Sequence, residues 1–122
     1  MNPLANAMSC FAHAYNGSLA LTAEQRGWSC TVAFVATDSG AAVAARIEDG
    51  RLVSIFEEAS GDVVVTSDEA TLRDILELRR GPDEPYLFGE LTVRGSESDF
   101  LRLGYIAGAL CPERAPAVTH GD

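Results

Sequence analysis

Carboxylic acids are the side chains of this sequence best placed to carry out chemistry, and Glu57 and Glu58 are the pair that stands out. They end a stretch whose alternation predicts a β-strand, in which neighbouring side chains point to opposite faces. If Glu57 points inward with Val53 and Ile55, burial raises its pKa and lets it exchange a proton with a bound ligand. The favoured alternative is that the strand reaches solvent by residue 57. Glu57 is therefore a weak catalytic candidate, and the catalytic residues are otherwise unknown.

Other reactive residue types form no recognisable site. His13 and His120 are the only histidines, so a zinc centre built on histidines is not expected. Cys10, Cys30 and Cys111 lack a Cys-x-x-Cys spacing, and we expect them to be reduced thiols of a cytoplasmic protein. The sequence has no Gly-x-Ser-x-Gly motif, P-loop or dinucleotide fingerprint. We therefore expect no metal and no cofactor, and whether the chain is an enzyme stays open.

The net charge of the chain excludes nucleic acids as partners and disfavours contact with anionic membranes. The 122 residues carry a net charge of −9, from 18 acids against 9 arginines and no lysine. Such a chain is repelled by the phosphates of nucleic acids and by anionic membranes.

The longest apolar-rich stretch, residues 100–110, contains Arg102 and is too short to insert stably into a bilayer. The lack of lysine, with abundant Ala, Gly and Arg, suits a bacterial genome rich in G and C.

Residue patterns predict a helix at about 3–16, a second after residue 66, one helical turn at 86–88 and a last helix reaching residue 110. The pair Asp49-Gly50 predicts a tight hairpin, because the second position of such a turn needs positive φ. We expect Val53 and Ile55 on the inner face and Leu52 on the outer one. Five strands are expected, at 28–37, 41–48, 52–59, 62–66 and 90–94.

The second helix has clear start and stop signals. Thr66 and Glu69 are spaced as a capping box, with Ser67 as the competing cap. Arg79 and Arg80 complement the helix dipole in the expected last turn. Gly81-Pro82 then predicts the end of the helix.

Three segments in the middle of the chain have a familiar order and spacing: Gly61–Thr66, Leu72–Gly81 and Phe88–Gly95. The first resembles the Ala-Asp-Val-Thr-Ile strand of the sterol carrier protein type two family, and the second resembles the helix that follows it. The third is similar to the family signature Gly-Lys-Leu-Lys-Val-Lys-Gly. The resemblance, over about residues 28–110, implies an α+β fold. That fold has a five-stranded, mostly antiparallel sheet, helices packed on one face, and an apolar cavity between sheet and helices.

The signature differs from the family at its charged positions, where Glu90, Thr92 and Arg94 replace lysines. The basic face of the lipid carriers is therefore missing, which disfavours membrane docking. A cavity is one interpretation of the apolar last helix and the small residues of the strands; the alternative is close packing. The residues expected to line the cavity are Trp28, Phe34, Val43, Ala45, Ile47, Val53, Ile55, Val64, Leu72, Ile75, Leu76, Tyr86, Phe88, Leu91, Phe100, Leu103 and Ala107.

We expect one domain over residues 1–111 and a flexible tail over 112–122. The expected function is binding of a hydrophobic small molecule (a lipid, fatty acyl, sterol or polyketide-like compound) as a carrier or accessory protein. The alternative is an enzyme of bacterial specialised metabolism, of cyclase or dehydratase type, acting on a hydrophobic intermediate. A homodimer and a partner enzyme both stay open.

Overall fold

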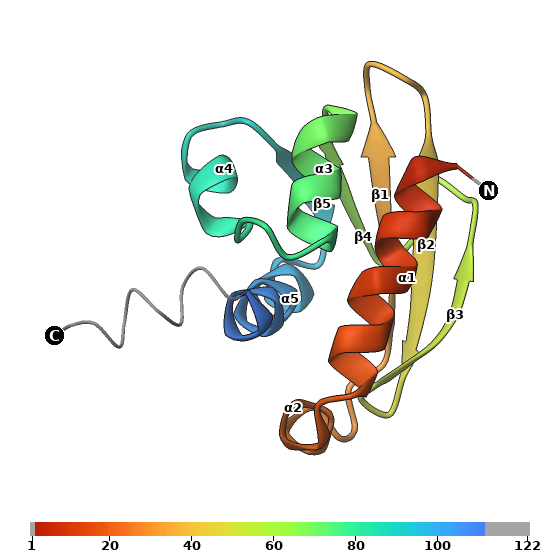
Figure 1. The fold of residues 1–122 in the computed structure, drawn as a ribbon, viewed down its shortest axis with the longest axis vertical. Coiled ribbons are helices and arrows are strands. Elements are labelled where there is room, and N and C mark those ends of the chain that lie inside the picture. Colours follow the sequence, from red (N-terminus) through yellow and green to blue (C-terminus); the bar gives the residue numbers. More distant parts are fainter. Residues whose placement is uncertain (1, 112–122) are drawn as a thin grey trace, which may run out of the picture.

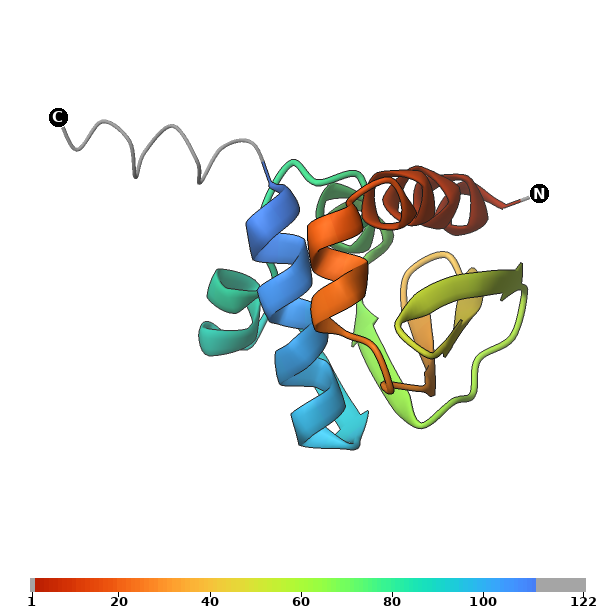
Figure 2. The ribbon, with the colours of Figure 1, turned by 90° about the horizontal axis from the view of Figure 1, so that it is seen from below.

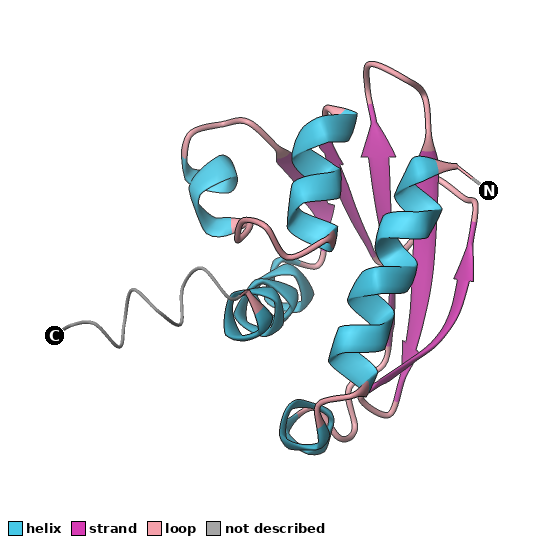
Figure 3. Cartoon of the chain, in the orientation of Figure 1, coloured by secondary structure: helices cyan, strands magenta, loops and turns pink. Residues whose placement is uncertain are grey.

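The computed structural model describes residues 2–111, apart from the side chain of Asp83. The expected tail at 112–122 and His120 lie outside the described residues. None of the described helices is long and apolar enough to cross a bilayer. The helices are α1 (Pro3–Asn16), α2 (Leu19–Glu24), α3 (Glu69–Leu76), α4 (Asp83–Leu87) and α5 (Glu97–Leu110), and the strands are β1 (Cys30–Ala36), β2 (Ala42–Glu48), β3 (Arg51–Phe56), β4 (Val63–Ser67) and β5 (Thr92–Gly95) (Figures 1 and 3).

The five strands form one sheet in the order β3-β2-β1-β4-β5. Three pairs are antiparallel, and β1 pairs with β4 in parallel. The connection from β3 to β4 passes on the side of the sheet away from α1 (Figure 2). The predicted α+β class and mostly antiparallel sheet are confirmed.

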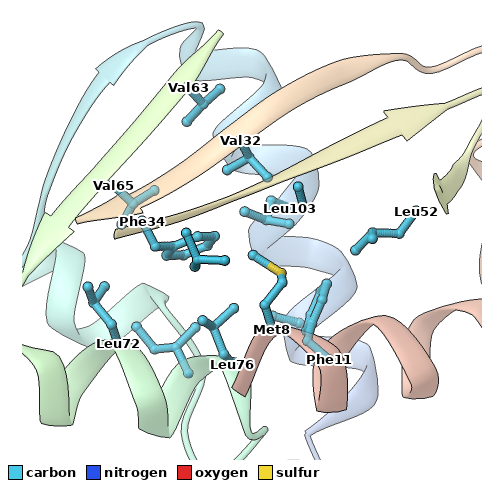
Figure 4. Packing of buried hydrophobic residues seen from close by; sticks show 14 of the residues in the cluster. Met8, Phe11, Val32, Phe34, Leu52, Val63, Val65, Leu72, Leu76 and Leu103 are labelled. Carbon is cyan, nitrogen blue, oxygen red and sulfur yellow. The ribbon is translucent and has the colours of Figure 1, made fainter. Parts of the chain in front are cut away.

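The core lies between the sheet and the helices. Alternate residues of β1 point into it, and the Phe34 ring points from the sheet toward Met8 of α1 and toward α3 (Figure 4). The residues between them point to the opposite face, where Ala33, Ala44 and Val64 form a small separate cluster. The opposite face thus carries a small apolar cluster, while the described helices pack on the face that carries Phe34.

The predicted hairpin joins β2 to β3. Asp49 and Gly50 have φ of 50° and 81°, which confirms a turn with two left-handed residues. A Cβ atom on Gly50 would lie 2.7 Å from the carbonyl oxygen of Gln25, so the turn also packs closely on the chain before β1. The hydroxyl of the buried Tyr15 donates a hydrogen bond to the Gly50 carbonyl, which joins the end of α1 to the same turn.

Helix α3 begins and ends elsewhere than predicted. Thr66 and Ser67 still belong to β4, so the capping box is wrong. The cap is Asp68, whose carboxylate accepts a hydrogen bond of 2.7 Å from the Thr71 N–H. This bond to the backbone holds the pKa of Asp68 below its usual value.

The C-terminus of α3 is a left-handed cap made by a leucine. Leu78 has a φ of 64°, its N–H bonds to the Ile75 carbonyl, and the Arg79 N–H bonds to the Asp74 carbonyl. These two bonds form the Schellman pattern, which glycine usually completes. Leu78 takes this conformation while its side chain packs on the core, so apolar burial offsets the strain. Residues 79–81 therefore lie beyond the helix.

The predicted faces of β3 are right at Ile55, which packs on the core, and wrong at Leu52 and Val53, because the strand has a bulge. The register with β2 shifts between Arg46 and Ile47, so the buried Leu52 pairs with Ile47. Val53 is displaced outward and is 54% exposed. The Asn16 side chain fixes the strand by donating to the Leu52 carbonyl at 2.8 Å and accepting from its N–H at 3.1 Å.

The short helix α2 was not predicted. Gly17 ends α1, but Ser18 also starts the next helix, because its hydroxyl accepts a bond of 3.3 Å from the Leu21 N–H. Helix α2 lies beside α5 (Figure 2), where it meets α5 through the contacts described below.

Candidate functional site

An apolar pocket lies between the sheet and α5, at the position where the sequence predicted a cavity. Side chains from α1, β1, β4, α3 and α5 surround it, together with one residue on either side of α4. All of its lining residues are apolar: Phe11, Phe34, Val65, Ile75, Leu76, Pro82, Leu91, Phe100, Leu103 and Ala107. The site therefore offers an apolar surface and no ionisable group.

The pocket is nearly filled by these side chains. Its free volume is about 10 Å³, which corresponds to roughly one water molecule. Sites that hold a small organic ligand usually measure about 300–1,000 Å³. Close packing, the alternative to the expected cavity, thus describes this conformation, and a ligand fits only if part of the wall moves. The small side chains of Ala33 and Ala44 add no space to the pocket, because they point to the opposite face of the sheet.

Part of the predicted lining is found around the pocket, and part is not. Phe11, Val65 and Pro82 line it but were not predicted. Val64 was predicted in place of Val65, and it lies on the opposite face of β4, paired with Ala33. The predicted residues that the structure brings together are Phe34, Ile75, Leu76, Leu91, Phe100, Leu103 and Ala107.

The other predicted residues lie outside the pocket wall. Val53 and Phe88 are exposed, so both predictions are wrong in orientation. Tyr86 lies just outside, with its ring centroid 5.0 Å from that of Phe100. The remaining ones belong to the surrounding core without lining the pocket: Trp28, Val43, Ala45, Ile47, Ile55 and Leu72.

Glu57 does not reach the pocket. Strand β3 ends at Phe56, so the alternation that places Ile55 inward does not continue to Glu57. Glu57 is exposed and accepts a hydrogen bond of 3.3 Å from the Asn2 N–H, next to the start of α1. A carboxylate in this place stabilises the positive end of the helix dipole.

Glu57 does line a second, more open groove. This groove has a volume of about 160 Å³ and lies between α1 and the end of β3. Its walls are Ala5, Ser9, Ile55, Phe56 and Glu57. The Ser9 hydroxyl donates to the Ala5 carbonyl at 3.2 Å, so it has no proton left for a ligand.

Helix α5, which covers the pocket, is joined along its first half to the segment between α2 and β1. The Trp28 indole N–H donates to Asp99 Oδ1 at 2.9 Å, and the Arg102 guanidinium lies 5.4 Å from the centre of the Trp28 ring. Arg102 also donates to Gln25 Oε1 at 2.7 Å. These contacts make α5 a fixed wall rather than a loose cover.

The two described core thiols are structural. Burial, the largest cause, together with the nearby acids Asp99 and Asp62, raises the pKa of Cys30 to about 12. Cys30 therefore stays a thiol at neutral pH and is a poor nucleophile. Cys111 donates to the Leu78 carbonyl at 3.3 Å, which joins the end of α5 to the loop after α3.

Comparison with known proteins identifies the fold. No family model and no curated protein matches this sequence. Among solved structures, a crystal structure of sterol carrier protein 2 is similar to this chain, with 19% identity and a TM-score of 0.67, over 88% of this chain and 95% of the other. A conserved hypothetical protein from Thermus thermophilus is 23% identical, with a TM-score of 0.67 over 87% of this chain and 82% of its own.

A third similar structure is the UbiJ-SCP2 ubiquinone synthesis protein, with 15% identity and a TM-score of 0.67, over 88% of this chain and 94% of the other. The chain thus has the sterol carrier protein 2 fold over most of its length. The resemblance predicted from residues 61–95 is confirmed at the level of the fold.

Proposed function

We propose that this chain, with its sterol carrier protein 2 fold, binds a hydrophobic small molecule in the pocket beneath α5. The single observation that carries the proposal is that all ten side chains around the pocket are apolar. A lipid, fatty acyl chain, sterol or polyketide-like compound would place hydrocarbon there. The protein would act as a carrier or accessory protein of the cytoplasm.

The driving force is transfer of hydrocarbon from water. Each buried methylene contributes about 0.8 kcal/mol, so a chain of ten methylenes gains on the order of 8 kcal/mol. That gain has to offset the separation of side chains that fill the pocket in the ligand-free state. A long apolar chain is therefore favoured over a small polar metabolite.

The charge of the protein surface affects where the ligand can be taken up and released. Glu90, Thr92 and Arg94 are exposed, and they replace the lysines of the family signature. With a net charge of −9, contact with an anionic bilayer is disfavoured. We propose that the ligand is exchanged with water, a neutral surface or a partner protein. No specific observation favours the alternative of a cyclase or dehydratase.

The test uses two substitutions on the same helix. Ala107 lines the pocket, whereas Ala109 is exposed two residues later. Binding of cis-parinaric acid, a fluorescent fatty acid, is titrated for the unmodified protein, Ala107→Leu and Ala109→Leu. We expect Ala107→Leu to weaken binding at least tenfold and Ala109→Leu to leave it unchanged.

Two results oppose the proposal. One is a lack of saturable binding by the unmodified protein, both for this probe and for hydrophobic compounds sought by native mass spectrometry of the purified protein. The other is equal binding by both variants. Thermal unfolding of each variant shows that the comparison is made between folded proteins.

A further inference from the structure

The wall of the pocket next to α4 differs from the other walls in how it is held. We propose that residues 82–89, here called the strap, form the gate through which an apolar chain enters the pocket. This inference rests on the proposed function, and it identifies the part of the wall that moves.

The hydrogen bonds of the strap are internal, except for one to Glu90 at its C-terminal end. The Tyr86 N–H bonds to the Pro82 carbonyl at 3.1 Å, the Phe88 N–H to the Glu84 carbonyl at 3.0 Å, and the Glu90 N–H to the Pro85 carbonyl at 2.7 Å. Among the described atoms, Glu90 is the one residue outside 82–89 that shares a hydrogen bond with the strap. The strap can therefore swing outward about its C-terminal end, where that single bond lies.

Apart from the bond to Glu90, apolar contact holds the strap against the body. Pro82 lines the pocket, Pro85 is fully buried, and the Tyr86 ring packs on Phe100 at an interplanar angle of 53°. Proline has no backbone N–H, so lifting this inner face leaves no donor without a partner at these positions. The outer face carries Leu87 and Phe88, which are 78% and 72% exposed.

Fixed points on both sides of the strap limit its movement. Arg80 and Glu90 form an ion pair with 3.3 Å between the nitrogen and the carboxylate oxygen. The Ser67 hydroxyl donates to the Glu90 carbonyl at 2.6 Å, which ties this end to β4. Left-handed residues lie before the strap and at its last position, with φ of 64° at Leu78 and 75° at Gly89. The base of the strap thus stays closed while the strap swings.

Helix α5, the other wall that could open, is held in place by polar contacts from three of its residues. Asp99 accepts from Trp28, Arg102 donates to Gln25, and Tyr105 donates to Glu24 at 3.1 Å. Moving α5 requires breaking these three side-chain bonds, whereas moving the strap requires separating apolar surfaces and bending at the bond to Glu90. The strap is therefore the part of the wall that opens, and Tyr86 on Phe100 is its main contact with α5.

The test measures rates as well as affinity. Stopped-flow fluorescence follows association and dissociation of cis-parinaric acid for the unmodified protein, Tyr86→Ala, Tyr86→Phe and Tyr105→Ala. For Tyr86→Ala we expect both rate constants to rise at least fivefold, with a Kd within twofold of the unmodified protein. Tyr86→Phe keeps the ring contact, and Tyr105→Ala alters an exposed tyrosine of α5, so both should retain the original rates.

Unchanged rates in Tyr86→Ala would overturn the gate, and so would an equal acceleration in Tyr105→Ala, because α5 would then be the part that opens. If Tyr86→Ala does not fold, Tyr86→Leu replaces it and keeps the apolar contact without the ring. Failure of the unmodified protein to bind the probe contradicts the proposed function. Binding with unaltered kinetics in the variants contradicts only the gate.

Discussion

The indole N–H of Trp28 donates a hydrogen bond of 2.9 Å to the carboxylate of Asp99, and this bond joins the chain before β1 to the first turn of α5. Trp28 is buried and was expected in the ligand pocket, but its polar edge is used to hold the helix that covers the pocket. The Arg102 guanidinium lies over the same ring. Trp28 thus stabilises a wall of the pocket instead of contacting a ligand.

Trp28→Phe should destabilise the protein by about 2 kcal/mol, because it removes a hydrogen bond to a charged acceptor and leaves the Asp99 carboxylate without that donor. Urea unfolding at neutral pH measures the change. Asp99→Asn keeps an acceptor at the same place and should cost less. Equal stability of Trp28→Phe and the unmodified protein would show that the bond does not hold α5.

Leu103→Ala should cost about 2–4 kcal/mol, because Leu103 lines the pocket and its removal leaves a cavity. Leu101, on the same helix, is 59% exposed, so Leu101→Ala should change stability by less than about 0.5 kcal/mol. The enlarged pocket should also bind benzene, which would raise the melting temperature of Leu103→Ala more than that of the unmodified protein. Similar costs for the two variants would mean that α5 does not present Leu103 to the core.

The Asp68 cap should make stability depend on pH in one direction. Its pKa is lowered in the folded state, chiefly by the hydrogen bond from the Thr71 N–H, so its contribution is present above the unfolded-state pKa. That contribution is lost as the pH falls through the lower folded-state pKa. Asp68→Ala should cost about 1 kcal/mol at pH 7, and this cost should shrink below about pH 3.8, the ordinary value for an aspartate.

Asp68→Asn is the control for this titration, because an amide oxygen still caps the helix but does not titrate. The stability difference between Asp68→Asn and Asp68→Ala should be the same at pH 7 and at pH 3. A constant cost of Asp68→Ala across that range would contradict the linkage.

Gly50→Ala should destabilise the hairpin more than Gly40→Ala. Both glycines have left-handed φ, of 81° and 78°, so both substitutions meet about 1–2 kcal/mol of backbone strain. Only at Gly50 would the new Cβ lie 2.7 Å from a backbone oxygen, whereas nothing lies within 4 Å at Gly40. Thermal unfolding should show the difference in stability between the two variants. Equal losses of stability would rule out the close approach of the Gln25 carbonyl to residue 50.

The sequence predicted the elements whose signals are local. The pair Asp49-Gly50 fixes a hairpin by itself, and the apolar run that ends at residue 110 forms α5. Leu78 carries no such signal, because leucine rarely adopts positive φ and does so here only with its side chain packed on the core. The predicted C-terminus of α3, at Gly81-Pro82, therefore lies beyond the observed end of the helix.

The pocket was harder to predict because it depends on which face each residue occupies. Val63-Val64-Val65 is an unbroken apolar run without alternation, so only its parallel pairing with β1 decides that Val65 faces the pocket and Val64 does not. No residue pattern in the sequence predicts the bulge before Val53. The free volume depends on how side chains interlock, which residue patterns do not specify.

The most direct test of ligand binding beneath α5 is the set of nuclear Overhauser effects between the chain protons of a bound fatty acid and the methyl groups of the protein. Val65 and Val64 are neighbours on opposite faces of β4, so they report the two faces under the same conditions. We predict effects to the methyl groups of Val65 and Leu103 and none to those of Val64. Effects to Val64, or none to Val65 and Leu103 at saturation, would contradict binding between the sheet and α5.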